Sequence, residues 1–185
     1  MEAEYEIGIR WTAFPLHPDT PEEGSALSDL FAGRNVDLPA MMDHLRAVAE
    51  QLDLEFGSRD HTYNSRMAQE LGKWAESQGR GHAYHLAVFR AYFADGSNIA
   101  DADILLSVCS NLGLDETKAR EVIDARTFRK SVDIDWQRSR KLGITAVPTF
   151  RLASSHLVGA QPYRKLADML ARHDVPQRDG RQRKD

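Results

Sequence analysis

The stretch Gly143-Ile144-Thr145-Ala146-Val147-Pro148-Thr149-Phe150 places a proline immediately before a run of alternating residues. Proline has no backbone N–H, so within sheets it is confined to edge strands, bulges and the first residue of a strand. A cis X-Pro bond is a small minority even among prolines. We therefore predict a cis Val147–Pro148 bond in a loop that presents backbone groups to a partner outside the strand.

The two ends of the chain have the period of β-strands. Residues 4–14 alternate, with Tyr5, Ile7, Ile9 and Trp11 on one face, and this pattern is typical of a half-buried strand. After Gly143 the period returns to two. We expect strands near 149–152 and 156–158 around a turn at 153–155, followed by a helix over 162–172.

The middle of the chain has helical periodicity. A cap at Asp37, Pro39 in the first turn and apolar residues at helical spacing predict the first helix of this block. A strand, a long helical block, then a hairpin and a helix describe one α/β layer that an insertion interrupts. Further helices are expected at about 64–79, 82–94, 101–112, 115–125 and 128–142. We predict a main domain from 1–36 and 143–172, a helical insertion over 37–142, and a disordered polar tail over 173–185.

Charge and cysteine content limit the classes of partner. The formal net charge of -4 gives no overall attraction to phosphate backbones or anionic lipid, so we expect neither a nucleic acid nor a membrane partner. A single cysteine excludes an intrachain disulfide and an intrachain dithiol cycle, which makes a cytoplasmic location the default. The first residues are acidic and then alternating, so we expect no signal peptide.

Several segments resemble one known family in order and spacing. They are Trp11–Pro18, Tyr63–Ala68, His85–Phe93, Val147–Phe150 and Gly159–Pro162. Together they are similar to the DsbA-like branch of the thioredoxin superfamily, in the group of polyketide-associated thiol oxidoreductases and 2-hydroxychromene-2-carboxylate isomerases. The resemblance implies an α/β thioredoxin-like fold with a helical insertion. In that family a cis-proline faces a Cys-x-x-Cys, or a lone Ser or Cys, at the head of the first helix.

This chain departs from the family pattern at its start. Residues 4–14 correspond to the second strand of the fold, so the first strand, the cysteine loop and the first helix are missing. We therefore expect an N-terminally incomplete fold with backbone groups left unpaired. Three remedies are open: closer approach of the remaining strands, a strand from another chain in a homodimer, or a mis-called start codon.

The resemblance also implies where ligands bind. Val147, Pro148 and Thr149 form the expected substrate-binding loop, and Asn64 and Arg66 are expected to line the cleft. Two plainer interpretations stay open, because Pro148 can simply end a loop, and Asn64 can be a helix cap beside a surface arginine. We expect no catalytic residue within this sequence.

Cys109 is the single cysteine, and it lies in an apolar helical run. No Lys, Arg or His lies within a turn of it, whereas a reactive thiol needs an electropositive and partly exposed site. We therefore predict a buried packing residue.

His82 and His85 are three residues apart on one predicted helix, and His61 could join them after folding. No Glu or Cys at metal-ligand spacing completes the set. We expect ordinary interfacial histidines and no metal site.

The family chemistry uses a low-pKa thiolate that attacks a disulfide beside the cis-proline. The resemblance thus implies a thiol-disulfide oxidoreductase, but this sequence lacks the nucleophile, and we predict that it does not catalyse dithiol exchange as written. One alternative is a non-catalytic module that binds a peptide or glutathione by backbone pairing at Val147. Another is a glutathione-dependent isomerase of the 2-hydroxychromene-2-carboxylate type. No cofactor is expected, since glutathione would be a substrate or ligand.

Overall fold

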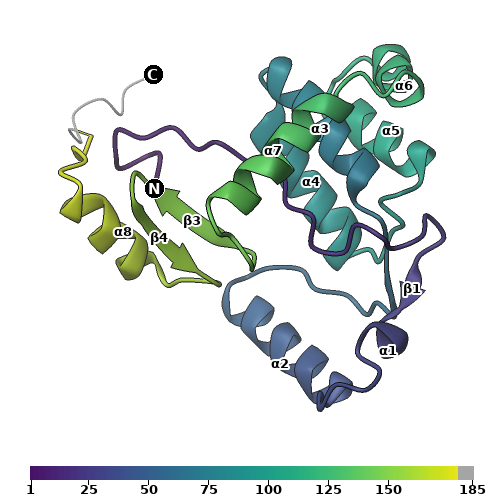
Figure 1. Ribbon diagram of the computed structural model, residues 1–185, viewed down its shortest axis with the longest axis horizontal. Helices are drawn as coiled ribbons and strands as arrows, with labels where there is room; N and C mark the ends of the chain where they lie inside the picture. Colours follow the sequence, from purple (N-terminus) through teal and green to yellow (C-terminus); the bar gives the residue numbers. More distant parts are fainter. Residues whose placement is uncertain (179–185) are drawn as a thin grey trace. The chain divides into compact units, whose positions relative to one another are not determined.

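The computed structural model describes residues 1–178, and these residues form two compact units (Figure 1). Unit 1 comprises Met1–Leu16 and Asp135–Asp185, and unit 2 comprises His17–Ile134. The predicted helical insertion began at residue 37 and ended at residue 142. The helical unit instead takes in the connector after residue 16, and the unit boundary falls within the last helix of the block.

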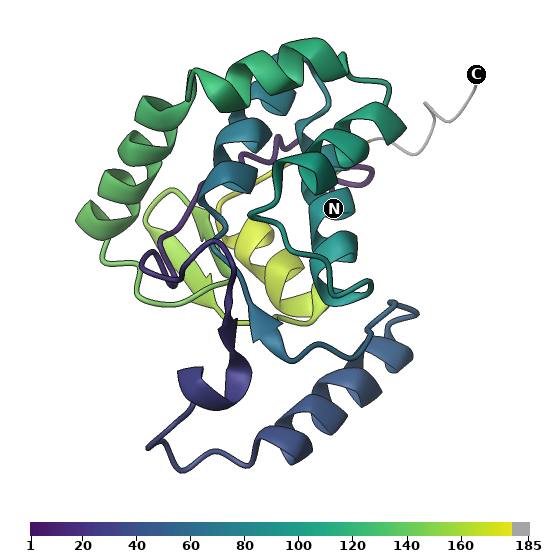
Figure 2. The same cartoon turned by 90° about the vertical axis from the view of Figure 1, so that its right-hand side faces the viewer.

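Unit 2 is built mainly from helices, and α3 packs against α4, α5 and α6 (Figures 1 and 2). Its elements are β1 (Ser25–Ala26), α1 (Leu27–Leu30), α2 (Leu38–Gln51), β2 (His61–Thr62), α3 (Arg66–Ser77), α4 (Gly81–Phe93), α5 (Ala102–Asn111), α6 (Glu116–Asp124) and the first part of α7 (Arg129–Lys141). The predicted helices are therefore confirmed to within a few residues. None of the helices in residues 1–178 combines the length and the apolar composition needed to cross a bilayer.

Aspartates start three of these helices. Asp37, Asp101 and Asp115 each accept a hydrogen bond from an amide in the following turn, at 3.0, 2.8 and 3.1 Å. Such a bond satisfies one of the N–H groups that a helix start leaves without a partner. The predicted cap at Asp37, with proline in the first turn of α2, is confirmed.

The core of unit 2 lies among α3, α4, α5 and α6. Leu71, Leu105 and Cys109 are 0% exposed, and Tyr84 is 1% exposed. Burying one leucine side chain contributes about 1.5–3 kcal/mol to stability. The other buried members of this core are Ala68, Trp74, Ala75, Val88, Ile99, Leu106, Ala119 and Ile123.

The described part of unit 1 contains the end of α7, a two-stranded hairpin and one further helix. β3 (Thr149–Leu152) and β4 (Ser155–Val158) are antiparallel, with Leu152 opposite Ser155. α8 (Tyr163–Arg172) lies beside the hairpin in both views (Figures 1 and 2). Just beyond α8, the imidazole Nε2 of His173 lies 2.8 Å from the hydroxyl of Ser155. The face of the hairpin that carries Ser155 is therefore the face toward α8.

The strand predicted over 4–14 does not form. In the described part of unit 1 the sheet has two strands, and the N-terminal segment makes a single isolated bridge, between Tyr5 and Gln177. Alternation predicts a strand, but a strand also needs a neighbour for its backbone groups. Side chains take that role here, because Asp135 accepts a hydrogen bond from Ala13 N at 3.0 Å.

The disordered tail predicted over 173–185 is wrong for its first part. Arg178 N donates to the carbonyl oxygen of Glu4 at 2.8 Å, and Glu6 N donates to that of Pro176 at 2.9 Å. The segment is polar, as expected, yet its backbone pairs with the N-terminal segment. The remainder of the predicted tail, 179–185, lies outside the described residues.

Candidate functional site

The loop between α7 and β3 carries three of the predicted site residues, at positions 147–149. It begins where α7 ends, at Gly143, whose φ of 67° is a left-handed conformation that glycine adopts without steric cost. Gly143 N donates to the carbonyl oxygen of Arg140 at 3.0 Å, and Ile144 N donates to that of Ser139 at 3.0 Å. These bonds satisfy carbonyl groups at the helix end and direct the chain into the loop.

Two hydrogen bonds fix the loop itself. The Val147–Pro148 peptide bond is cis. The carbonyl oxygen of Pro148 accepts a hydrogen bond of 2.7 Å from Gly159 N, which extends the hairpin by one pair. The hydroxyl of Thr149 donates to the carbonyl oxygen of Ala146 at 2.7 Å. Val147 is 43% exposed. The two hydrogen bonds therefore fix the loop while this residue faces solvent.

The hairpin register decides which backbone groups point away from it. Opposite residues in an antiparallel ladder alternate between pairs that exchange hydrogen bonds and pairs that do not. The bond from Gly159 places Pro148 in the bonded set, so Thr149 and Arg151 turn their backbone groups outward, and the exposed Val147 lies beside them in the loop. We call these three residues the outer edge of β3. No strand within residues 1–178 pairs with this edge, so its groups are open to an extended chain.

Asn64 joins the chain before α1 to the start of α3. Its Nδ2 donates to the carbonyl oxygen of Thr20 at 2.7 Å, and its Oδ1 accepts a hydrogen bond of 2.9 Å from Arg66 N. Ser65 occupies the N-cap position of α3 without a side-chain cap bond, and the second bond shows that Asn64, one residue earlier, satisfies the first amide of the helix. A role of Asn64 toward a ligand stays a prediction.

Arg66 is not a free surface arginine. Its Nε donates to Glu70 at 2.6 Å, and its Nη2 donates to Asp133 and to the carbonyl oxygen of Arg129, each at 2.8 Å. Its side chain is 17% exposed. These contacts tie α3 to the start of α7, and a ligand role for Arg66 stays a prediction.

The structure divides the five predicted site residues between the two units. Val147, Pro148 and Thr149 belong to unit 1, and Asn64 and Arg66 belong to unit 2. Only the first three share a loop. The outer edge of β3 is therefore the candidate site that one unit supplies by itself.

Glu70 is the centre of the ionic network around Arg66, and sequence reasoning missed it. It is 3% exposed and accepts two hydrogen bonds of 2.7 Å from Arg126 besides the one from Arg66. Burial alone raises the pKa of a carboxyl group, but the bonds from Arg126 and Arg66 hold the pKa of Glu70 below its usual value. The four-residue spacing of Arg66 and Glu70 was a local signal for this pair. No local pattern indicates Arg126, which comes from beyond α6.

Cys109 has no nucleophilic character in the fold. It is 0% exposed inside the unit 2 core, as predicted. Burial, with a smaller effect of Glu116, raises the pKa of its thiol to about 12. A thiolate is the reactive form of cysteine, so this side chain is almost entirely unreactive near neutral pH.

The histidines considered as metal ligands make other contacts. His61 Nδ1 lies 2.7 Å from Asp60, and His85 Nε2 lies 3.3 Å from Glu76. Burial lowers the pKa of His85, and the neighbouring Glu76 only partly opposes this effect. Within residues 1–178, no group of three or more His, Cys, Asp or Glu side chains is arranged to hold a metal ion.

Comparisons with known proteins cover most of the chain. The family model of the DSBA-like thioredoxin domain matches residues 1–171. The uncharacterized protein YwbO of Bacillus subtilis is 26% identical over 166 residues, which are 84% of this chain and 76% of that protein. The crystal structure of a probable DsbA oxidoreductase from Streptomyces coelicolor is also 26% identical, with a TM-score of 0.80 over 87% of this chain and 73% of that one.

A second solved structure is similar in fold alone. It is a 2-hydroxychromene-2-carboxylate isomerase, 19% identical, with a TM-score of 0.71 over 92% of this chain and 83% of the isomerase. Both structures cover most of this chain, which has the thioredoxin-like fold of the DsbA group.

Proposed function

Because this chain belongs to the DSBA-like thioredoxin domain family, we propose that it keeps the ligand-binding loop of the family and binds a peptide or a small thiol compound without exchanging disulfides. The observation that carries the proposal is the outer edge of β3, where exposed backbone groups have no partner strand in the described residues. We also propose a cytoplasmic location, which the single buried cysteine supports.

The absence of exchange chemistry follows from the only sulfhydryl in the sequence. Disulfide exchange needs a thiolate that attacks one sulfur of a disulfide and displaces the other. Cys109 is enclosed in the core, and its pKa of about 12 leaves it protonated at neutral pH. With one cysteine the chain also cannot form the intrachain disulfide that completes a dithiol cycle. The proposed activity of these 185 residues is therefore binding.

The binding mode follows from the loop. An extended peptide placed beside the outer edge of β3 exchanges backbone hydrogen bonds with Val147 and Thr149, in the manner of a strand added to a sheet. Glutathione is itself a tripeptide and offers the same groups over a shorter length. Pro148 has no N–H, and its carbonyl oxygen is already bonded to Gly159, so it offers no backbone group to the peptide.

Amide exchange measured by NMR tests this mode directly. On addition of reduced glutathione or an uncharged extended peptide, the amides of Val147 and Thr149 should exchange more slowly. His156 and Val158 are the matched control, because they turn outward on the opposite edge of the hairpin and should not change. Equal exchange with and without ligand at both edges, at saturating concentrations, would remove the proposal.

Insulin reduction tests the second half of the proposal. The chain should give no turnover above the uncatalysed reaction with dithiothreitol, and Cys109→Ala should give the same rate. A rate above background that Cys109→Ala abolishes would show that the buried thiol takes part after all.

A further inference from the structure

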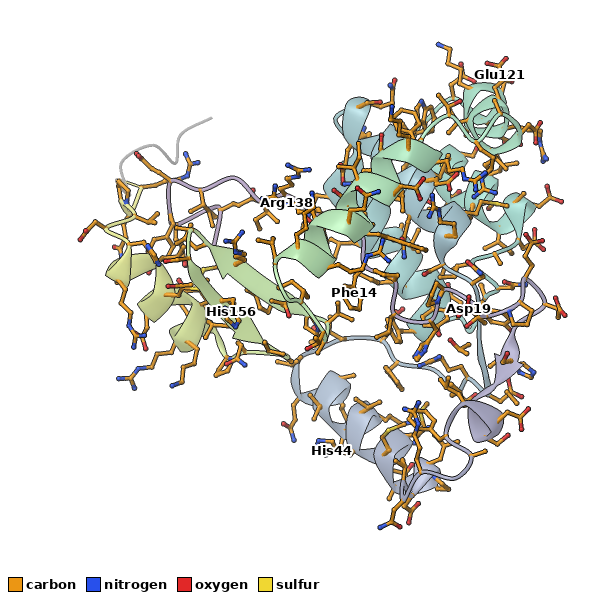
Figure 3. All side chains as sticks on the ribbon, in the orientation of Figure 1. Phe14, Asp19, His44, Glu121, Arg138 and His156 are labelled. Atoms are coloured by element: carbon orange, nitrogen blue, oxygen red, sulfur yellow. The ribbon has the colours of Figure 1, made fainter. Side chains whose placement is uncertain are left out.

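The face of the hairpin that is turned away from α8 has a particular chemistry. Arg151 and His156 are opposite each other in the register, and both are exposed. As a pair that does not exchange backbone hydrogen bonds, their Cβ atoms are about 4.5–5.5 Å apart, so the two side chains stand together. His156 is labelled on the hairpin in Figure 3.

We propose that the strand bound at the outer edge of β3 belongs to an acidic peptide, with a carboxylate side chain opposite Arg151. This inference rests on the proposed function and names the class of its ligand. The partner strand exchanges backbone bonds with Thr149 and Arg151, and the carboxylate meets a cation on the exposed face of the hairpin.

Arg151 is available for such a partner. Within residues 1–178 it forms no ion pair, although several acidic side chains belong to the same unit. Three of those acids are engaged elsewhere: Asp135 accepts from Ala13 N, Glu2 accepts from Ile9 N, and Glu4 accepts from the hydroxyl of Tyr163. In the described residues the positive charge beside the open edge therefore has no ion-pair partner from its own unit.

The charge of the whole unit favours the same ligand. In its described residues unit 1 contains 9 Lys and Arg against 6 Asp and Glu, whereas unit 2 contains 12 against 20. The formal charges are thus +3 and -8. Basic residues also end the helix that leads into the loop, at Arg138, Arg140 and Lys141. A surface of one sign attracts ligands of the opposite sign and raises their rate of encounter.

The chemistry of strand pairing sets the expected preference. Opposite charges that face each other across two strands stabilise the pair, and each such pair changes the dissociation constant by up to about fivefold. The intervening positions of the peptide lie on the other face, beside Phe150 and Leu152 of β3, which favour uncharged side chains. The ligand is thus an extended segment in which acidic residues alternate with small or apolar residues.

Two fluorescently labelled peptides separate the effect of charge from that of backbone pairing: one alternates Thr and Glu, and the other alternates Thr and Gln. Fluorescence anisotropy measures the binding of each peptide to the full chain. The Glu peptide should bind several times more tightly, and the difference should shrink with added salt. Arg151→Gln should remove most of the difference between the two peptides, because it takes away the charge that faces the carboxylate. Arg164→Gln removes the same charge at an exposed position of α8 and should preserve the difference in affinity between the Glu and Gln peptides.

N-methylated peptides test the strand geometry. Methylating alternate amides of the Glu peptide in one register should abolish binding, and methylating the intervening amides should be tolerated, because successive amides point to opposite sides of a strand. An equal loss from both sets would overturn strand pairing at this edge.

The remaining outcomes separate this inference from the proposed function. Equal affinity for the Glu and Gln peptides would overturn the acidic preference and leave peptide binding intact. No binding of either peptide, with no protection at Val147 and Thr149, would remove both. A dimer in light scattering whose β3 edge amides are protected before any peptide is added would assign the edge to a second copy and overturn the inference.

Discussion

Gly159 N donates a hydrogen bond of 2.7 Å to the carbonyl oxygen of Pro148, so the residue after β4 fastens the loop before β3. Gly159 has a φ of 84°, a value that residues with a Cβ atom adopt only with strain. The space around it is open, since an added Cβ atom would meet nothing within 4 Å. The requirement for glycine here is therefore conformational and not steric.

Gly159→Ala should lower the free energy of unfolding by about 1–2 kcal/mol, the usual cost of placing a side chain in the left-handed region. Urea denaturation followed by circular dichroism measures this change. Gly8→Ala is the matched control, because Gly8 has equally open surroundings and no positive φ. Equal stability of the two variants would show that Gly159 can leave its conformation at no cost.

The sequence was most informative where local signals decide the structure. Helix caps and apolar periodicity located the helices of unit 2, and the proline before an alternating run located the loop and the hairpin. The comparisons confirm the thioredoxin-like α/β fold that the resemblance implied. These features depend on residues that are close along the chain, so one sequence is enough to find them.

The errors concern contacts between distant segments. Residues 4–14 have a strand pattern, but the pattern cannot show whether a neighbouring strand exists, and the described sheet supplies none. Likewise, polar composition predicted disorder after residue 172, whereas pairing of Arg178 with Glu4 orders the start of that segment. Glu70 and Arg126 are 56 residues apart, so their ion pair has no local signature.

Cys109 should not react with Ellman's reagent in the folded protein at pH 8, and it should react fully in denaturant. The physical reason is that the thiol is buried and its pKa is raised to about 12, so neither access nor thiolate is available. The reaction is followed by absorbance. The fully unfolded chain is the control, because it should give the signal of one accessible thiol. Rapid labelling of the native protein would contradict the burial of this residue.

The same thiol predicts a pH dependence at alkaline pH. A group whose pKa is higher in the folded state contributes stability that is present below its unfolded pKa, near 9.0, and is lost as pH rises toward about 12. Stability should therefore fall over this range, and Cys109→Ala should reduce the fall. Comparing the unaltered chain with Cys109→Ala at each pH cancels the effect of other groups that titrate in this range, such as tyrosines. Parallel curves for the two chains would contradict the shift.

Glu70→Gln should destabilise unit 2 by about 2–3 kcal/mol, because the guanidinium groups of Arg66 and Arg126 lose the charge that they share. Glu50→Gln changes an exposed residue of α2 in the same way and should have little effect. The pKa of Glu70 is lowered on folding, so its contribution is present above the unfolded value of 4.5 and is lost as pH falls through the folded one. The difference in unfolding free energy between the two variants should therefore shrink in acid. A difference that is independent of pH would show that the charge of Glu70 is not its cause.

Asp135 should hold the N-terminal segment in place of the missing strand pairing. Its side chain is 2% exposed, and its Oδ2 accepts a hydrogen bond of 3.0 Å from Ala13 N. Asp135→Ala leaves that amide without an acceptor, so residues 7–14 should exchange their amide hydrogens faster, and stability should fall by about 1–3 kcal/mol. Hydrogen exchange with mass spectrometry measures the exchange rates of this segment directly. Asp168→Ala, at an exposed position of α8, is the control. If exchange over 7–14 is the same in Asp135→Ala and in the unaltered chain, some other contact holds the segment.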